Sequence, residues 1–94
     1  MEKIRFKNTE FNAGTMEIAG VKILLINAEK GSLGCAYLNL AAAEKFDHAL
    51  AIVSGVASYE DMFNAEVKSV STAAAAMGVT PGMNGFEALK LMNK

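Results

Sequence analysis

The sequence predicts an α+β fold, in which an N-terminal, mostly antiparallel sheet is followed by one strand–helix–strand crossover and by C-terminal helices packed on the sheet. Three observations support this prediction. Successive strand patterns precede residue 39, which favours an antiparallel meander. A short alanine-rich helix then separates two apolar strands. Two capping boxes begin helices in the C-terminal part of the chain.

Four segments in the N-terminal part have strand character. Residues 3–7 alternate between charged and apolar side chains, which predicts a half-buried strand. Thr15–Ile18 alternates in the same way. Val21–Ile26 is apolar without alternation over its second half, which is typical of a strand with both faces covered. Leu33–Leu38 is the fourth predicted strand.

The crossover is predicted from the segment that follows. Leu40–Phe46 is a short helix capped by Asn39, and Ala49–Val53 is a buried strand. The interval from Leu38 to Ala49 is about the dozen residues that a connection between parallel strands requires. We therefore expect one right-handed crossover.

Two further helices are predicted in the C-terminal part. Ser58–Asp61 resembles a capping box and begins a helix that continues to Gly78. Asn84–Glu87 is a second capping box and begins the last helix. The buried positions are expected at Val67, Val70, Ala74 and Met77 in the first helix, and at Phe86, Leu89 and Met92 in the second.

Composition limits the class of protein. Ninety-four residues make a single domain, residues 1–94, with a modest core. Hydrophobic residues make up 52% of the chain, above the usual range of about 45–50%. Because Ile23–Ile26 is apolar on both faces, we expect the N-terminal sheet to meet another copy of the chain in a homodimer or homotetramer.

Charge and cysteine content exclude several functions. The net charge is −1 and no basic face is evident, so we expect no binding to nucleic acid. A single cysteine cannot form an internal disulfide, and no apolar segment has the length of a signal peptide or membrane span. The chain is therefore expected to be soluble and cytoplasmic, with no membrane association. One Cys and one His are too few for a zinc site, and no motif indicates a cofactor.

Cys35 has two interpretations. It is either a small buried hydrophobe or a reactive thiol that serves an enzyme. A reactive thiolate needs a nearby histidine, cation or helix N-terminus, and Lys30 and His48 are the candidates close in sequence. No residue is assigned a catalytic role, because no triad is evident.

A ligand site is predicted at one edge of the sheet. If Leu33–Leu38 and Ala49–Val53 are parallel neighbours, their carboxyl ends meet, and open sheets bind ligands there. Helix N-termini at that edge would favour a small anionic or polar ligand, with apolar walls from Tyr37 or Tyr59. The alternative is that the polar residues only cap their own helices. The predicted site residues are Cys35, Asn39, Ser54, Gly55 and Ser58.

Three motifs resemble a known family. They are Gly31-x-x-x-Cys35-x-x-Leu38-Asn39, Glu66-Val-Lys-Ser-Val-Ser-x-Ala-Ala, and Gly78-Val-Thr-Pro-Gly-Met-Asn-Gly-Phe-Glu-Ala-Leu. Together they resemble the YunC-like family, a bacterial and archaeal domain of unknown function, over about residues 21–92. The resemblance implies a small α+β domain whose N-terminal sheet region, about residues 1–38, forms oligomers, tetramers included. It implies no reaction.

The chain departs from that family's pattern at one point. Ala36 follows the cysteine where the family usually has glycine, and its methyl group narrows the approach of a ligand to the backbone. The sequence thus favours a homo-oligomeric module that binds a small ligand or a protein. The alternatives are an enzyme that uses Cys35 as a reactive thiol and a purely structural subunit.

Overall fold

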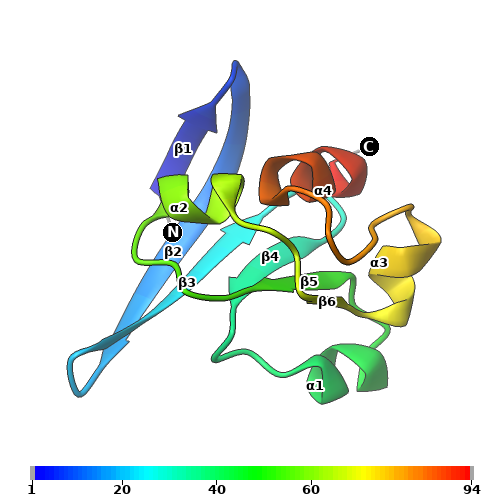
Figure 1. The fold of residues 1–94 in the computed structure, drawn as a ribbon, viewed down its shortest axis with the longest axis horizontal. Helices are drawn as coiled ribbons and strands as arrows, with labels where there is room; N and C mark the ends of the chain where they lie inside the picture. The colour runs from blue at the N-terminus through cyan, green and yellow to red at the C-terminus, as the bar shows by residue number, and fades with distance from the viewer. Residues whose placement is uncertain (1, 94) are drawn as a thin grey trace.

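The computed structural model describes residues 2–93, which form a six-stranded mixed sheet with helices on both faces (Figure 1). The predicted domain also includes Met1 and Lys94, which lie outside the described residues. The strands lie in chain order, and β4 and β5 are parallel whereas the other neighbours are antiparallel. The predicted α+β class is confirmed. The strands are β1 (Glu2–Phe6), β2 (Thr9–Ile18), β3 (Val21–Asn27), β4 (Ser32–Cys35), β5 (Leu50–Val53) and β6 (Ser69–Val70). The helices are α1 (Leu40–Lys45), α2 (Tyr59–Asn64), α3 (Thr72–Ala76) and α4 (Gly85–Met92).

The first strands differ from the prediction at their ends. The strand predicted over residues 3–7 is β1, which ends before Lys7 because this residue has a φ of 49° and begins the turn into β2. β2 begins well before the predicted Thr15. Its first half contains asparagine, alanine and glycine, which disfavour strands, but pairing with β1 on one side and β3 on the other overrides that preference. β4 ends at Cys35 because the carbonyl of Cys35 accepts the Leu38 N–H at 3.0 Å and closes a turn.

The predicted strand–helix–strand unit is confirmed. The side chain of Asn39 accepts the backbone N–H of Ala41 at 2.6 Å and so caps α1. The helix ends at Lys45, one residue before the prediction, with Phe46 as its C-cap. β5 then pairs in parallel with β4.

The single helix predicted from Ser58 to Gly78 is wrong. The structure has α2, the two-residue strand β6 and α3 in its place. Beyond the end of α2 the backbone N–H of Val67 donates to Met83 O at 2.8 Å, and that of Lys68 donates to Ile52 O at 2.8 Å. These bonds hold the chain extended at the edge of the sheet. Of the four positions predicted to be buried, Val67 and Ala74 are buried, whereas Val70 and Met77 are only half-buried.

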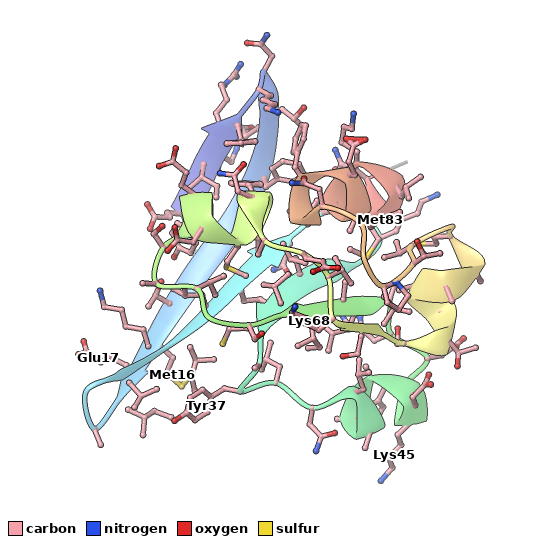
Figure 2. All side chains as sticks on the ribbon, in the orientation of Figure 1. Met16, Glu17, Tyr37, Lys45, Lys68 and Met83 are labelled. Atoms are coloured by element: carbon pink, nitrogen blue, oxygen red, sulfur yellow. The ribbon has the colours of Figure 1, made fainter. Side chains whose placement is uncertain are left out.

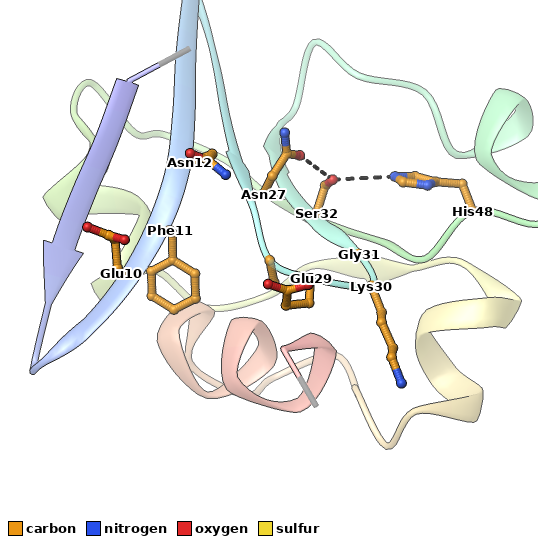
Figure 3. A pocket seen from close by; sticks show the side chains of 10 residues that line it. Glu10, Phe11, Asn12, Asn27, Glu29, Lys30, Gly31, Ser32 and His48 are labelled. Carbon is orange, nitrogen blue, oxygen red and sulfur yellow. Dashed lines mark hydrogen bonds between the residues drawn. The ribbon is translucent and has the colours of Figure 1, made fainter.

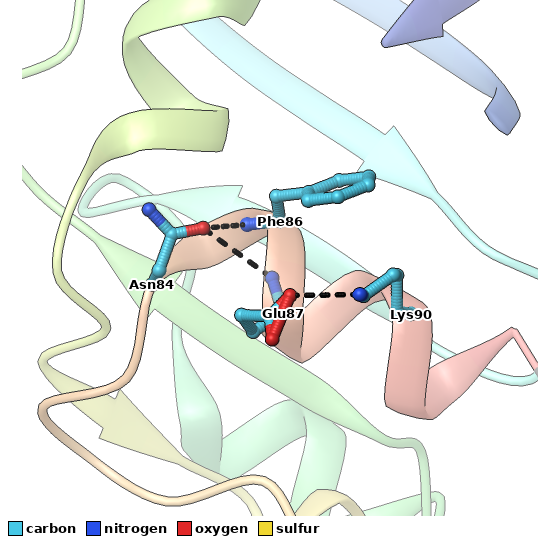
Figure 4. Close-up of polar contacts among 4 residues, drawn as sticks. All are labelled: Asn84, Phe86, Glu87 and Lys90. Atoms are coloured by element: carbon cyan, nitrogen blue, oxygen red, sulfur yellow. Dashed lines mark hydrogen bonds and ion pairs between the residues drawn. The ribbon is translucent and has the colours of Figure 1, made fainter. Parts of the chain in front are cut away.

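The caps of the C-terminal helices are confirmed. Ser58 Oγ accepts the N–H of Asp61 at 3.1 Å. Asn84 Oδ1 accepts the backbone N–H groups of Phe86 and Glu87 at 2.9 and 3.4 Å (Figure 4). The Glu87 carboxylate lies 3.0 Å from Lys90 Nζ, one helical turn away. The predicted buried positions of α4 are all buried: Phe86, Leu89 and Met92.

The two faces of the sheet differ in how they are covered. Alternate residues of a strand point to opposite faces. Ala51 and Val53 belong to the main core together with residues of α2 and α4, whereas Leu50 and Ile52 pack with Leu38, Leu40 and Ala43 of the α1 segment. The face that carries α1 is therefore named the α1 face. On β3, the main-core side chains are Leu24 and Ile26, whereas Ile23 and Leu25 on the α1 face are only half-buried.

Candidate functional site

The carboxyl ends of β4 and β5 meet as the crossover prediction requires. The two strands are in parallel register, with Cys35 opposite Val53. A hollow of about 550 Å³ lies at this edge, which we name the carboxyl-edge hollow. It is the position at which open sheets with parallel strands bind ligands. Its lining comes from the tip of the β2–β3 hairpin, the end of β4 and the segment after β5, and includes Lys22, Cys35, Ala36, Tyr37 and Gly55.

The five predicted site residues do not share one surface. Cys35 and Gly55 line the carboxyl-edge hollow. Ser54 is exposed directly after β5. Asn39 lines a different hollow beside α1, and Ser58 lines a smaller one together with Tyr59.

The side chains of both capping residues of the predicted site already accept a hydrogen bond. Asn39 accepts a hydrogen bond from Ala41 N, and Ser58 accepts one from Asp61 N, each at the start of a six-residue helix. Their side-chain oxygens thus serve their own helices. What remains of the predicted site is the pair Cys35 and Gly55, with Tyr37 as an apolar wall.

Lys22 is the charged side chain that sequence reasoning missed. It lines the carboxyl-edge hollow and also the smaller hollow at Ser58. It lies at the start of β3, paired with Glu17 across the hairpin. The hairpin turn at Ala19 and Gly20 could have been used to place it, since a long hairpin carries its tip to the far edge of the sheet.

Cys35 is buried beneath this hollow. Its residue is 6% exposed and belongs to the main core. The backbone N–H of Leu24 donates to Cys35 Sγ at 3.4 Å. The two candidate activators lie at the other end of the strands, because Lys30 precedes β4 and His48 precedes β5, whereas Cys35 is the last residue of β4. The structure does not bring Cys35 together with either of them.

A second polar cluster lies at the opposite, amino end of β4. Ser32 Oγ donates to Asn27 Oδ1 at 2.6 Å, and His48 Nε2 lies 3.4 Å from Ser32 Oγ (Figure 3). A hollow of about 590 Å³ opens beside them, with Glu10, Glu29 and Lys30 in its lining. The sequence did not indicate this cluster, because Asn27 and Ser32 lie just outside the two predicted strands, Val21–Ile26 and Leu33–Leu38.

Two general properties bear on the chemistry. Among residues 2–93, no group of three or more His, Cys, Asp or Glu side chains is placed to hold a metal ion. None of the helices in this part of the chain is long and apolar enough to cross a membrane.

Comparisons with known proteins give a family but no activity. The family described as a domain of unknown function, DUF1805, matches residues 34–92. No curated protein matches the sequence. The crystal structure of a protein of unknown function from Thermoplasma acidophilum is similar, with a TM-score of 0.88 and 24% sequence identity. The alignment covers 97% of this chain and 89% of the archaeal one, and it shows a shared fold.

Proposed function

Because the chain belongs to the DUF1805 family, a domain without an assigned activity, we propose its function from its own geometry: a homo-oligomeric module that binds a small anionic or polar ligand at the carboxyl-edge hollow. The observation that carries the proposal is the combination in that hollow of a lysine, an aromatic wall and the exposed segment after β5, at the edge where such sheets bind ligands.

The chemistry of the hollow suits a small anion. Lys22 supplies a positive charge, and the lining holds no acidic side chain among the described residues. Gly55 has a φ of 70° and an open space where a Cβ would lie, so a ligand could approach its backbone closely. The methyl group of Ala36 narrows the hollow on the side of β4. Tyr37, whose residue is 64% exposed, offers a ring to cover a bound ligand.

We test the ligand with inorganic phosphate as the probe. Backbone amide shifts of 15N-labelled protein should change saturably at Lys22, Ala36 and Gly55. Lys22→Ala should weaken phosphate binding by about two- to fivefold, the scale of an exposed charge pair. Lys68→Ala is the matched control, because Lys68 is an exposed lysine just before β6 that pairs with Glu66. An equal loss in both variants, or shifts that map elsewhere, would contradict the proposal.

The oligomer is supported by an uncovered apolar surface. Met16 pairs with Ile23, and Ile18 pairs with Val21, so these four side chains share the α1 face at the end of the sheet. Met16 is 62% exposed and Ile18 is 53% exposed. Figure 2 shows Met16 and Tyr37 at the end where the β2–β3 hairpin turns. A contiguous exposed apolar patch of this kind is typical of an interaction surface, and a second copy of the chain is the proposed partner.

We expect Met16→Glu to weaken self-association while the monomer stays folded. A carboxylate at this position would lose its hydration in the contact between two copies. Sedimentation velocity would read the change in association. Glu17→Lys is the matched control, because Glu17 is the next residue of the same hairpin and points to the opposite face. The patch is refuted if Met16→Glu associates like the wild type.

We also propose that the chain is a YunC-like member of this family and that it is cytoplasmic. The first is supported by the three sequence motifs, which span about residues 21–92. The second is supported by the free, buried cysteine. Cytoplasmic proteins keep such thiols reduced.

The second candidate function is an enzyme that uses Cys35, favoured by the presence of Lys22 in the same hollow. Burial favours the structural role. We therefore expect iodoacetamide to alkylate Cys35 far more slowly in native than in denatured protein, as measured by mass spectrometry. Cys35→Ser should lower the free energy of unfolding by about 1–3 kcal/mol, because the hydroxyl would be buried in an apolar core. If Cys35 is alkylated rapidly in folded protein and Cys35→Ser is as stable as the wild type, the enzyme function is favoured instead.

A further inference from the structure

One row of polar side chains crosses the α1 face on β2, β3 and β4. Asn12 pairs with Asn27, and Asn27 pairs with Ser32, so the three lie side by side on β2, β3 and β4. The next row on the same face is Gly14, Leu25, Gly34 and Ile52. Asn27 and Ser32 of this row line the hollows beside His48, which places polar groups where a ligand can contact them.

Hydrogen bonds position the side chain at the β4 end of this row. Ser32 is 5% exposed, and its hydroxyl is held between Asn27 and His48. His48 is itself held at both backbone groups: its N–H donates to Ala43 O at 2.8 Å, and its carbonyl accepts the Ser71 hydroxyl at 2.8 Å. The backbone of His48 is thus anchored, and its exposed side chain lies beside Ser32 (Figure 3).

These polar groups close one end of an apolar hollow. A space of about 410 Å³ lies between the α1 segment and the sheet. Its walls include Leu25, Leu38, Leu50 and the ring of Phe46, a residue that is 75% exposed. The described residues that line it include no Lys, Arg, Asp or Glu. Apolar walls with a few convergent polar groups are the usual form of a small-molecule site.

We propose that this hollow binds a small uncharged molecule with a flat apolar body and an amide-like edge, such as an aromatic amide or a nucleobase. The apolar walls and the Phe46 ring bury the flat body, since aromatic rings stack favourably. Serine, asparagine and histidine side chains can each take part in hydrogen bonds with such an edge, which carries both donors and acceptors. A charged ligand is disfavoured, because the described lining includes no Lys, Arg, Asp or Glu to compensate for its loss of hydration.

The test compares benzamide with benzoate, which have the same shape and differ in charge. In 15N-labelled protein, millimolar benzamide should shift the Ser32 backbone amide and the His48 resonances saturably. Benzoate should bind at least about tenfold more weakly, because no Lys or Arg in the described lining compensates for the lost hydration of its carboxylate. The proposal is overturned if benzamide leaves these resonances unchanged, if its shifts map elsewhere, or if benzoate binds equally well.

Two variants distinguish a local effect on benzamide binding from a general loss of structure. Phe46→Ala removes only an exposed ring and should weaken benzamide binding by about two- to tenfold. Lys45→Ala is its control, because Lys45 is the neighbouring exposed residue and lies outside the lining. Ser32→Ala should also weaken binding, with the amide spectrum reporting whether the fold is kept. Unchanged affinity in Phe46→Ala and Ser32→Ala together would overturn the site. Phosphate binding at Lys22 is independent of all these outcomes.

Discussion

Replacing Gly85 with alanine is expected to remove about 3 kcal/mol from the free energy of unfolding, which is a large share of the stability of a domain this size. A Cβ at this position would collide with the backbone carbonyl oxygen of Met62 and lie 3.0 Å from Leu33 Cδ2. A backbone carbonyl cannot rotate away as a flexible side chain does. The N–H of Gly85 also donates to Ala65 O at 2.8 Å, so the first residue of α4 is hydrogen-bonded to the end of α2. Urea unfolding followed by circular dichroism would measure the loss.

Gly20→Ala is the matched control for this prediction. Gly20 has a φ of 84°, and no atom lies within 4 Å of the position where a Cβ would be. Only the strain of a left-handed backbone is added, which costs about 1–2 kcal/mol. If the two variants lose the same stability, the close approach of α4 to α2 is not what requires glycine at position 85.

Phe63→Ala is expected to lower the free energy of unfolding by about 3–5 kcal/mol, the usual range for a buried phenylalanine. The ring of Phe63 is stacked on that of Phe6, with centroids 4.3 Å apart and an interplanar angle of 6°. It also contacts the rings of Phe11 and Phe86. These four rings join the β1–β2 hairpin to α2 and α4, so the truncation leaves a cavity where three elements meet. Thermal and urea unfolding would both report the loss.

The control here is Phe46→Ala. Its ring is on the surface, since Phe46 is 75% exposed and follows α1. Surface truncations of this kind usually change stability by no more than about 0.5 kcal/mol. A similar loss in both phenylalanine variants would contradict the placement of the aromatic core between the hairpin and the two helices.

Local signals in the sequence were sufficient for the crossover and for the presence of four N-terminal strands, but not for the full length of β2. Asn39 and Ser58 are caps in the structure because their side chains have a free N–H group within reach at a helix start. The segment from Ala65 to Ser71 was predicted to be helical but is extended, because no local partner determines its conformation. Its conformation is set by distant carbonyls, those of Ile52 and Met83 among them, and such partners leave no local pattern.

The candidate site was predictable only in part. Parallel pairing of β4 and β5 followed from the length of the connection, and it correctly located an edge at which Cys35 and Gly55 line one hollow. Lys22 reaches that hollow through the β2–β3 hairpin, whose full length was not evident from the sequence. The cluster of Asn27, Ser32 and His48 depends on strand register, which brings together residues that are far apart along the chain.

The molar mass of the wild-type protein in solution tests the central proposal most directly, because the uncovered patch at Met16 and Ile18 is the basis for assembly. Size-exclusion chromatography with multi-angle light scattering at micromolar concentration should give two or four times the 9.9 kDa of one chain. A mass equal to one chain, unchanged as the concentration is raised, would contradict the account.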